Sequence, residues 1–302
     1  MGVDVIVAEN LTKTYGGRRG LAGLDLVVRP GEVLGFLGPN GAGKTTTIRL
    51  LLDLIRPTAG TVRVLGLDPR ADAVALNRRI GYLPGDLVVD SRHTVETCLG
   101  FLASLRGGAG RDRIGALAGR LGLERSAPIR SLSKGNRQKV GIVQAFMHEP
   151  ELLILDEPTA GLDPLVQQTF LAMVGEAAAR GATVFMSSHV LTEVEAVADR
   201  VAIIRDGRLV ALDTFAALRA SAVRRVDLTF TEPVDPAEFA GLPGVTDLHA
   251  DGASLRCHLT GSPDALLRAA TRHTVTGIVA TEPALEDLFH SYYTGPEPID
   301  AR

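Results

Sequence analysis

Residues 38–46 read Gly38-Pro39-Asn40-Gly41-Ala42-Gly43-Lys44-Thr45-Thr46. The run fits the spacing G-x-x-x-x-G-K-[ST] of a phosphate-binding loop, in which glycines let successive backbone N–H groups point at phosphate oxygens. In such a loop Lys44 supplies a positive charge to the β- and γ-phosphates, and the Thr45 hydroxyl is placed to coordinate Mg²⁺. An apolar run over residues 33–37 precedes the loop and a helix-compatible segment follows it, as the motif requires. We therefore expect residues 38–46 to bind a nucleoside triphosphate with Mg²⁺.

A second stretch, Leu152-Leu153-Ile154-Leu155-Asp156-Glu157-Pro158, is an apolar strand that ends in two adjacent carboxylates. A buried strand of a parallel sheet delivers its last residues to the carboxyl edge of the sheet, where the phosphate loop also opens. We expect Asp156 to hold the Mg²⁺ shell and Glu157 to orient or polarise the attacking water. A strand end capped by solvated acids is the common alternative, but the phosphate loop upstream favours the functional interpretation.

The pattern around these stretches predicts an α/β fold. Residues 5–28 alternate apolar and polar side chains around the Gly16-Gly17 turn, as an antiparallel strand pair does. Between about residues 86 and 150 no strand is apparent, and three amphipathic segments predict a helical insertion. Elsewhere, short apolar strands alternate with helices, which implies a mostly parallel sheet covered on both faces. The expected insertion helices are 95–105, 111–123 and 134–148; the expected strands are 33–37, 61–65, 80–84, 152–155, 183–187, 200–205 and 208–212.

The character of the chain changes after about residue 220. Short strands are expected at 224–230, 244–249, 254–259 and 274–280, with helical stretches at 236–240 and 263–271 and a last helix at 284–292. The order βαββαβ is that of a small ferredoxin-like unit. We therefore expect a first domain over residues 1–220 and an α+β accessory domain over residues 221–302.

Composition narrows the class of protein. The chain has 302 residues, of which 45% are hydrophobic, as expected for a packed protein of two domains. Its formal net charge of −3 lacks the basic surplus that is typical of a nucleic-acid-binding protein. No apolar run approaches the roughly 18–20 residues of a membrane-spanning helix, and the start lacks the layout of a signal peptide. Cys98 and Cys257 stand alone, so we expect two buried small residues rather than a metal site. These features indicate a cytoplasmic protein.

Taken in order, the motifs resemble those of the nucleotide-binding subunit of an ATP-binding cassette (ABC) transporter, over about residues 3–218. The matching elements are Tyr15, the loop 38–46, Leu132-Ser133-Lys134-Gly135-Asn136, Asp156-Glu157, Ala160-Gly161-Leu162-Asp163 and Ser187-Ser188-His189. The resemblance implies a P-loop NTPase cassette that uses ATP and Mg²⁺. In the family the early aromatic stacks on adenine, and the final histidine contacts the γ-phosphate and helps to place the water.

The resemblance also implies partners. Ser133, Lys134, Gly135 and Asn136 match the signature sequence, which in the family contacts a γ-phosphate held by the other subunit's phosphate loop. Two copies would then dimerise head to tail to build two sites. An integral membrane permease would be the second partner, with the chain bound peripherally at the inner face of the membrane. No nucleic acid partner is expected.

Two positions depart from the family pattern. Where the family usually has a glutamine that touches Mg²⁺, this chain has Gly85 followed by Asp86. Either Asp86 supplies a carboxylate ligand or the metal shell holds one more water, and we favour Asp86. The signature is Ser-Lys-Gly-Asn rather than Ser-Gly-Gly-Gln, which resembles the branch of drug and antibiotic exporters with a separate permease and an extra C-terminal domain.

The leading hypothesis is an ATPase subunit that powers a membrane exporter, with the helical insertion passing motion to the permease. The alternative is a non-transport ABC ATPase acting in translation or DNA maintenance. Translation factors of the family carry two cassettes in one chain, whereas this sequence has one phosphate loop, and no coiled-coil or zinc insertion is visible. The C-terminal domain could regulate the cassette through a ligand or simply brace it, and the sequence favours neither.

Overall fold

The chain is described by a computed structural model that covers residues 3–88, 92–220, 222–281 and 289. Internal contacts divide it into two compact units, residues 1–212 and 213–302. The boundary expected from sequence lies after residue 220, whereas in the structure helix α8 (Phe215–Ala220) falls in the second unit. Each unit has a hydrophobic core of its own.

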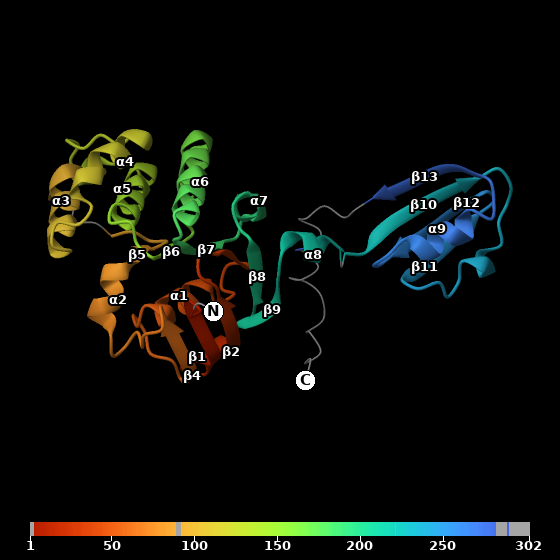
Figure 1. Cartoon of the computed structure of the whole chain (residues 1–302), viewed down its shortest axis with the longest axis horizontal. Coiled ribbons are helices and arrows are strands. Elements are labelled where there is room, and N and C mark those ends of the chain that lie inside the picture. Colours follow the sequence, from red (N-terminus) through yellow and green to blue (C-terminus); the bar gives the residue numbers. More distant parts are fainter. Residues whose placement is uncertain (1–2, 89–91, 221, 282–288, 290–302) are drawn as a thin grey trace. The chain divides into compact units, whose positions relative to one another are not determined.

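The first unit contains an antiparallel sheet with the order β2-β1-β4 (Figure 1). Strands β1 (Ile6–Tyr15) and β2 (Arg18–Val28) form the predicted hairpin. Its turn residues Gly16 and Gly17 both have positive φ, which glycine adopts without a steric penalty. Strand β4 (Ala59–Val64) pairs with the other edge of β1.

The second sheet of this unit has six strands in the order β5-β6-β7-β3-β8-β9 and is mostly parallel, as predicted. Its central strands are buried along their whole length, which explains their apolar sequences. In Figure 1, helices α6 and α7 lie above this sheet and α1 lies below it. The strands are β3 (Val33–Leu37), β5 (Ile80–Leu83), β6 (Leu152–Asp156), β7 (Thr183–Ser188), β8 (Arg200–Arg205) and β9 (Arg208–Asp213); the helices are α1 (Lys44–Leu51), α2 (Ala73–Arg79), α6 (Pro164–Ala179) and α7 (Leu191–Glu195).

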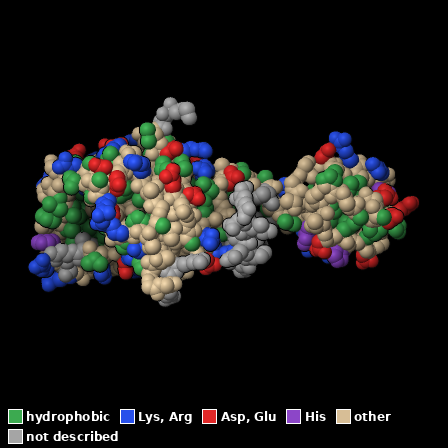
Figure 2. Space-filling view, turned by 90° about the horizontal axis from the view of Figure 1, so that it is seen from below, with side chains coloured by type: hydrophobic (Ala, Val, Ile, Leu, Met, Phe, Trp, Pro, Cys, Tyr) green, Lys and Arg blue, Asp and Glu red, His purple; other side chains and the backbone are tan. Residues whose placement is uncertain are grey.

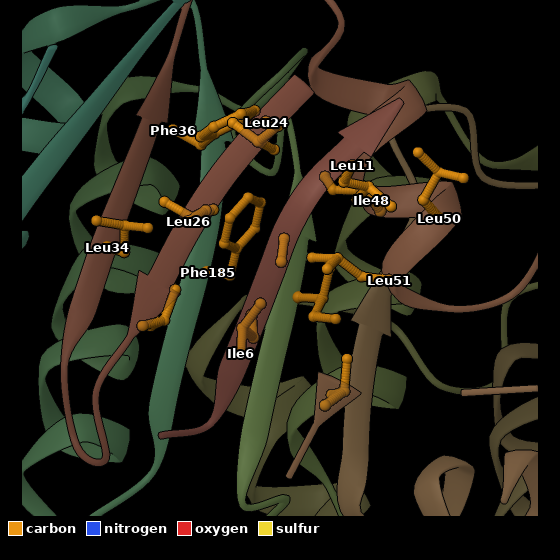
Figure 3. Close-up of a cluster of buried hydrophobic side chains, with 14 of the residues drawn as sticks. Ile6, Leu11, Leu24, Leu26, Leu34, Phe36, Ile48, Leu50, Leu51 and Phe185 are labelled. Atoms are coloured by element: carbon orange, nitrogen blue, oxygen red, sulfur yellow. The ribbon is translucent and has the colours of Figure 1, made fainter. Parts of the chain in front are cut away.

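The core of the first unit lies between its two sheets and includes α1. Figure 3 shows apolar side chains of β1 and β2 facing those of β3, β7 and α1. The rings of Phe36 and Phe185 pack with their centroids 5.1 Å apart. Fully burying a side chain of this kind stabilises the fold by roughly 1.5–3 kcal/mol. This packing fixes α1, and with it Lys44 at the first position of the helix, relative to the strands that carry the other candidate residues.

The predicted helical insertion is confirmed. It contains α3 (Val95–Leu105), α4 (Ile114–Arg120) and α5 (Lys134–Phe146). Two hydroxyl side chains cap its helices, because Thr94 accepts from the backbone N–H of Thr97 and Ser133 from that of Asn136. The segment predicted at 111–123 is shorter than expected, since its first residues form a 3-10 turn (Arg111–Arg113) before α4 begins.

The second unit is a four-stranded antiparallel sheet with the order β11-β12-β10-β13. From β10 onward its element order matches the prediction except that residues 236–240 form a single 3-10 turn, Pro236–Glu238, soon followed by Gly241 with φ of 78°. The helix expected over residues 284–292 lies outside the described residues except for Phe289, which is buried. The elements are β10 (Arg224–Phe230), β11 (Val245–Asp251), β12 (Ser254–Leu259), β13 (Val275–Thr281) and α9 (Asp264–Ala270).

Candidate functional site

Two glycines of the phosphate loop, Gly38 and Gly43, lie where side chains would collide with the backbone. A Cβ at Gly38 would fall 2.4 Å from the carbonyl oxygen of Ile204, and a Cβ at Gly43 would fall 2.8 Å from that of Gly20. Gly43 also has φ of 115° and immediately precedes α1, so the loop runs directly into a helix N-terminus. The free N–H groups of such an end, with the positive pole of the helix, suit an anion. This geometry suits the phosphate contact that the sequence predicts.

Lys44 is buried at the base of this loop. Its Nζ donates hydrogen bonds to the carbonyl oxygens of Gly38 (2.6 Å) and Pro39 (3.3 Å). It also lies 3.2 Å from Oε1 of Glu157, which balances its charge. The ammonium group is thus held under the loop by groups that a phosphate could replace.

Asp156 is bonded on both carboxylate oxygens. Thr45 donates to Oδ2 at 2.9 Å and Ser187 donates to Oδ1 at 2.6 Å, and only 2% of Asp156 is exposed. A hydroxyl and a carboxylate oxygen side by side are hard oxygen ligands of the kind that Mg²⁺ prefers. The pair therefore fits a divalent cation, and the role of Ser187 in orienting Asp156 was not predicted from the sequence.

Glu157 and His189 meet at the end of strands β6 and β7. Nδ1 of His189 lies 2.7 Å from Oε2 of Glu157, while Lys44 approaches Oε1. The backbone of Glu157 has φ of 47°, and its N–H is held by the Oγ and carbonyl oxygen of Ser187 at 3.1 and 3.2 Å. A non-glycine residue in this conformation costs of order 1–3 kcal/mol and persists only where the surroundings enforce it. The structure thus brings Lys44, Glu157 and His189 together around one carboxylate.

The signature residues lie at the start of α5 and touch the segment after Glu157. A Cβ at Gly135 would fall 2.4 Å from the carbonyl oxygen of Gly161, so only glycine permits this approach. Gln138 donates from Nε2 to the carbonyl oxygen of Pro158 at 3.0 Å, a contact that the sequence did not reveal. Ser133, Lys134 and Asn136 complete this surface, and in the described part of the chain no hydrogen bond or ion pair joins them to residues 38–46.

Tyr15 lies beside the phosphate loop. Its side chain is 44% exposed, and a Cβ at Gly20 would fall 2.6 Å from its ring, while Gly20 itself borders Gly43. Lys13 places its Nζ 5.3 Å from the ring centroid. A half-exposed ring at the mouth of a phosphate loop is available for stacking, which suits the predicted contact with adenine.

Gly85 borders Asp156, one of the two candidate Mg²⁺ ligands, and Asp86 follows it in the chain. A Cβ at Gly85 would fall 3.5 Å from Oδ2 of Asp156. Asp86 is exposed and lines a cavity of about 300 Å³ with Lys134, Arg137 and Gln138. The position that borders Asp156 therefore has no side chain, and Asp86 lies next to the signature residues.

Comparison with known proteins agrees with this geometry. The sequence family described as "ABC transporter" matches residues 21–160. The chain is 40% identical to a bacitracin transport ATP-binding protein of Enterococcus faecalis over 68% of each chain. It is 35% identical to a daunorubicin resistance ATP-binding protein of Streptomyces coeruleorubidus over 96% of each, so that similarity includes the second unit.

Solved structures share the fold over about 70% of the chain. An ATP-binding subunit of an ABC transporter superposes with a TM-score of 0.67 at 32% identity, over 71% of this chain and 92% of that one. A dimeric ATP-binding cassette bound to ADP and Pi gives 0.63 at 22% identity, over 69% and 98%. With the phosphate loop, Asp156 and Glu157 assembled as described, the chain belongs to the ABC transporter family as an ATP-binding, ATP-hydrolysing subunit.

Proposed function

We propose that the chain powers export through a separate integral membrane permease, acting as a head-to-tail homodimer at the inner face of the membrane. The observation that supports an interaction with the permease is an open apolar groove beside the nucleotide site. The relatives described above are named for bacitracin transport and daunorubicin resistance rather than for translation or DNA maintenance, which supports the exporter over the non-transport alternative. No helix within the described residues is long and apolar enough to cross a membrane.

In this proposal Thr45 and Asp156, whose oxygens lie 2.9 Å apart, would hold Mg²⁺. The ion would polarise the phosphate oxygens. Lys44 exchanges its contact with Glu157 for the β- and γ-phosphates, and this frees Glu157 to orient a water. His189 then contacts the γ-phosphate and keeps the Glu157 carboxylate turned toward that water, because phosphoryl transfer depends on positioning and charge stabilisation.

The homodimer rests on the separation of the signature from the phosphate loop. Ser133 and Lys134 are exposed at the N-terminus of α5, a site that favours an anion. Within the described chain these residues have no bond to residues 38–46, which fits a phosphate supplied by a second copy. Each site then needs Gly38–Thr46 of one chain and Ser133–Asn136 of the other.

The groove lies between α2 of the core and α3 of the helical insertion. It has a volume of about 730 Å³, and Val74, Phe101 and Leu105 on its walls are 72%, 60% and 67% exposed. Figure 2 shows hydrophobic side chains gathered around a hollow at the left end of the larger unit. Exposed apolar groups this close together mark an interaction site. Burial raises the pKa of Tyr82, another lining residue, and the nearby Asp156 carboxylate raises it further.

Placing a charge in this groove tests the permease interaction. Leu105→Glu should reduce co-purification with the permease at least about tenfold, since desolvating the new carboxylate opposes docking. The ATPase rate of the isolated chain should stay within about twofold, because Leu105 does not touch the site. The matched control is Leu165→Glu on α6, which is 75% exposed and outside the groove. Equal permease binding by both variants would overturn the docking role of the groove.

Asp86 is proposed as an additional Mg²⁺ ligand. Asp86→Ala should raise the Mg²⁺ concentration for half-maximal ATPase activity about three- to tenfold, because a carboxylate ligand is replaced by water. The measurement is a Mg²⁺ titration at saturating ATP, with Asp112→Ala, an acid of the first 3-10 turn, as control. An unchanged titration would contradict this role and favour one more water in the metal shell.

A further inference from the structure

Helix α7 carries a carboxylate that bonds to both segments of the catalytic pair. Oε2 of Glu193 accepts a hydrogen bond from Thr159 Oγ1 at 2.6 Å and from Ser188 Oγ at 3.2 Å. Thr159 lies two residues after Glu157, and Ser188 directly precedes His189. Both hydroxyl residues are buried, with exposures of 4% and 1%. One oxygen therefore ties together the two chain segments that present Glu157 and His189.

The helix that carries Glu193 is itself fixed to the sheet. A Cβ at Gly35 of β3 would fall 1.9 Å from Cγ1 of Val194, so Val194 fills the space that the missing side chain leaves. Leu191 and Val194 are both buried. Because this close packing opposes a shift of α7 along the sheet, it fixes the position of the Glu193 backbone relative to the two loops.

The bonds around Ser188 extend the effect to both sides of His189. The Ser188 hydroxyl accepts from the backbone N–H of Val190 at 2.9 Å while it donates to Glu193. The residues before and after His189 are thus held by one network whose charged member is Glu193. Hydrogen bonds to an ionised acceptor are roughly twice as strong as neutral ones, so this carboxylate is the strongest single tie in the network.

We propose that Glu193 is a positioning residue of the ATPase, which sets the distance between Glu157 and His189 by holding Thr159 and Ser188. Its carboxylate is bonded to Thr159 and Ser188, so it acts through these side chains. Its loss would let the two loops drift independently. The 2.7 Å contact between His189 and Glu157 would then be populated less often.

Kinetics of Glu193 variants separate this role from general support of the fold. Glu193→Ala should lower kcat about 10- to 100-fold, because a displacement of ~1 Å in a catalytic group has effects of this size. KM for ATP should change less than about twofold, since Lys44 and the phosphate loop keep their own contacts. Glu193→Gln retains an acceptor oxygen and should recover kcat to within about fivefold of the unmodified chain. Thr192→Ala, an exposed position on the same helix, is the matched control.

A double-mutant cycle tests the path of the effect. Thr159→Val alone should lower kcat, but it should have little further effect when added to Glu193→Ala, because the bond is already gone. The proposal is overturned by any one of three results: Glu193→Ala keeps full kcat, Glu193→Gln has a kcat no higher than that of Glu193→Ala, or the effects of Thr159→Val and Glu193→Ala on kcat multiply. A parallel rise in KM and fall in melting temperature, without a specific loss of kcat, would assign Glu193 to fold stability alone.

Discussion

Glu157→Gln is expected to lower the ATPase rate about 100- to 1000-fold, the range in which loss of a general base and its charge acts. The substitution keeps the size of the side chain, and its carbonyl oxygen can still face His189. The substitution removes the negative charge of the carboxylate. This carboxylate would accept a hydrogen bond from the attacking water, and its Oε1 lies 3.2 Å from Nζ of Lys44. Steady-state phosphate release with the purified chain measures the rate.

The affinity of Glu157→Gln for ATP should not fall together with the ATPase rate. Lys44 loses its ion-pair partner and a negative charge leaves the vicinity of the γ-phosphate, so affinity for ATP should stay equal or increase. Binding of a fluorescent ATP analogue measures this separately from hydrolysis. Glu176→Gln, which loses only an exposed pair with Arg120, is the control and should change neither quantity. A Glu157→Gln variant that keeps more than about half of the rate would show that another group activates the water.

Most helices and strands could be predicted from the sequence because apolar runs and amphipathic spacing depend only on neighbouring residues. The apolar run of β6 is buried at every residue, and the three insertion helices carry amphipathic spacing together with cap residues such as Thr94 and Ser133. Strand β4 was recognised as a strand, but its membership in the antiparallel sheet depends on pairing with β1, about fifty positions away in sequence. The turn at Pro236–Glu238 was predicted as part of a helix because so short a sequence does not decide between a helix and a turn.

For the candidate site, the motif residues could also be predicted from the sequence, whereas the residues that orient them could not. The motif spacings identified Lys44, Asp156, Glu157 and His189 as candidates, and the structure brings all four together. The roles of the groups that orient them were missed, since Ser187, Gln138 and Glu193 act through hydrogen bonds whose partners are remote or belong to another element. Ser187 stands in the quoted histidine motif, but glutamine and glutamate are common residues, and no sequence pattern distinguishes Gln138 and Glu193 from exposed ones. Distances between side chains had to be known first.

Gly135→Ala is the second substitution expected to have a large effect. The new Cβ would fall 2.4 Å from the carbonyl oxygen of Gly161, which is backbone and cannot rotate away. Either the start of α5 or the segment after Glu157 must therefore shift, and the Gln138 bond to Pro158 at 3.0 Å would be strained. We expect the ATPase rate to fall at least about tenfold, with an overpacking penalty of roughly 1–3 kcal/mol in the free energy of unfolding.

The control for this substitution has the opposite expected sign. Gly119 lies within α4, where an added Cβ would meet nothing within 4 Å. Gly119→Ala should therefore raise the free energy of unfolding by about 0.5–1 kcal/mol, the usual difference between alanine and glycine in a helix, and leave the ATPase rate unchanged. Denaturant unfolding and phosphate release measured on both variants distinguish the steric effect from the change of residue type. If Gly135→Ala behaved like Gly119→Ala, the contact between the signature and Gly161 would not constrain the site, because a small backbone shift would absorb the extra methyl group.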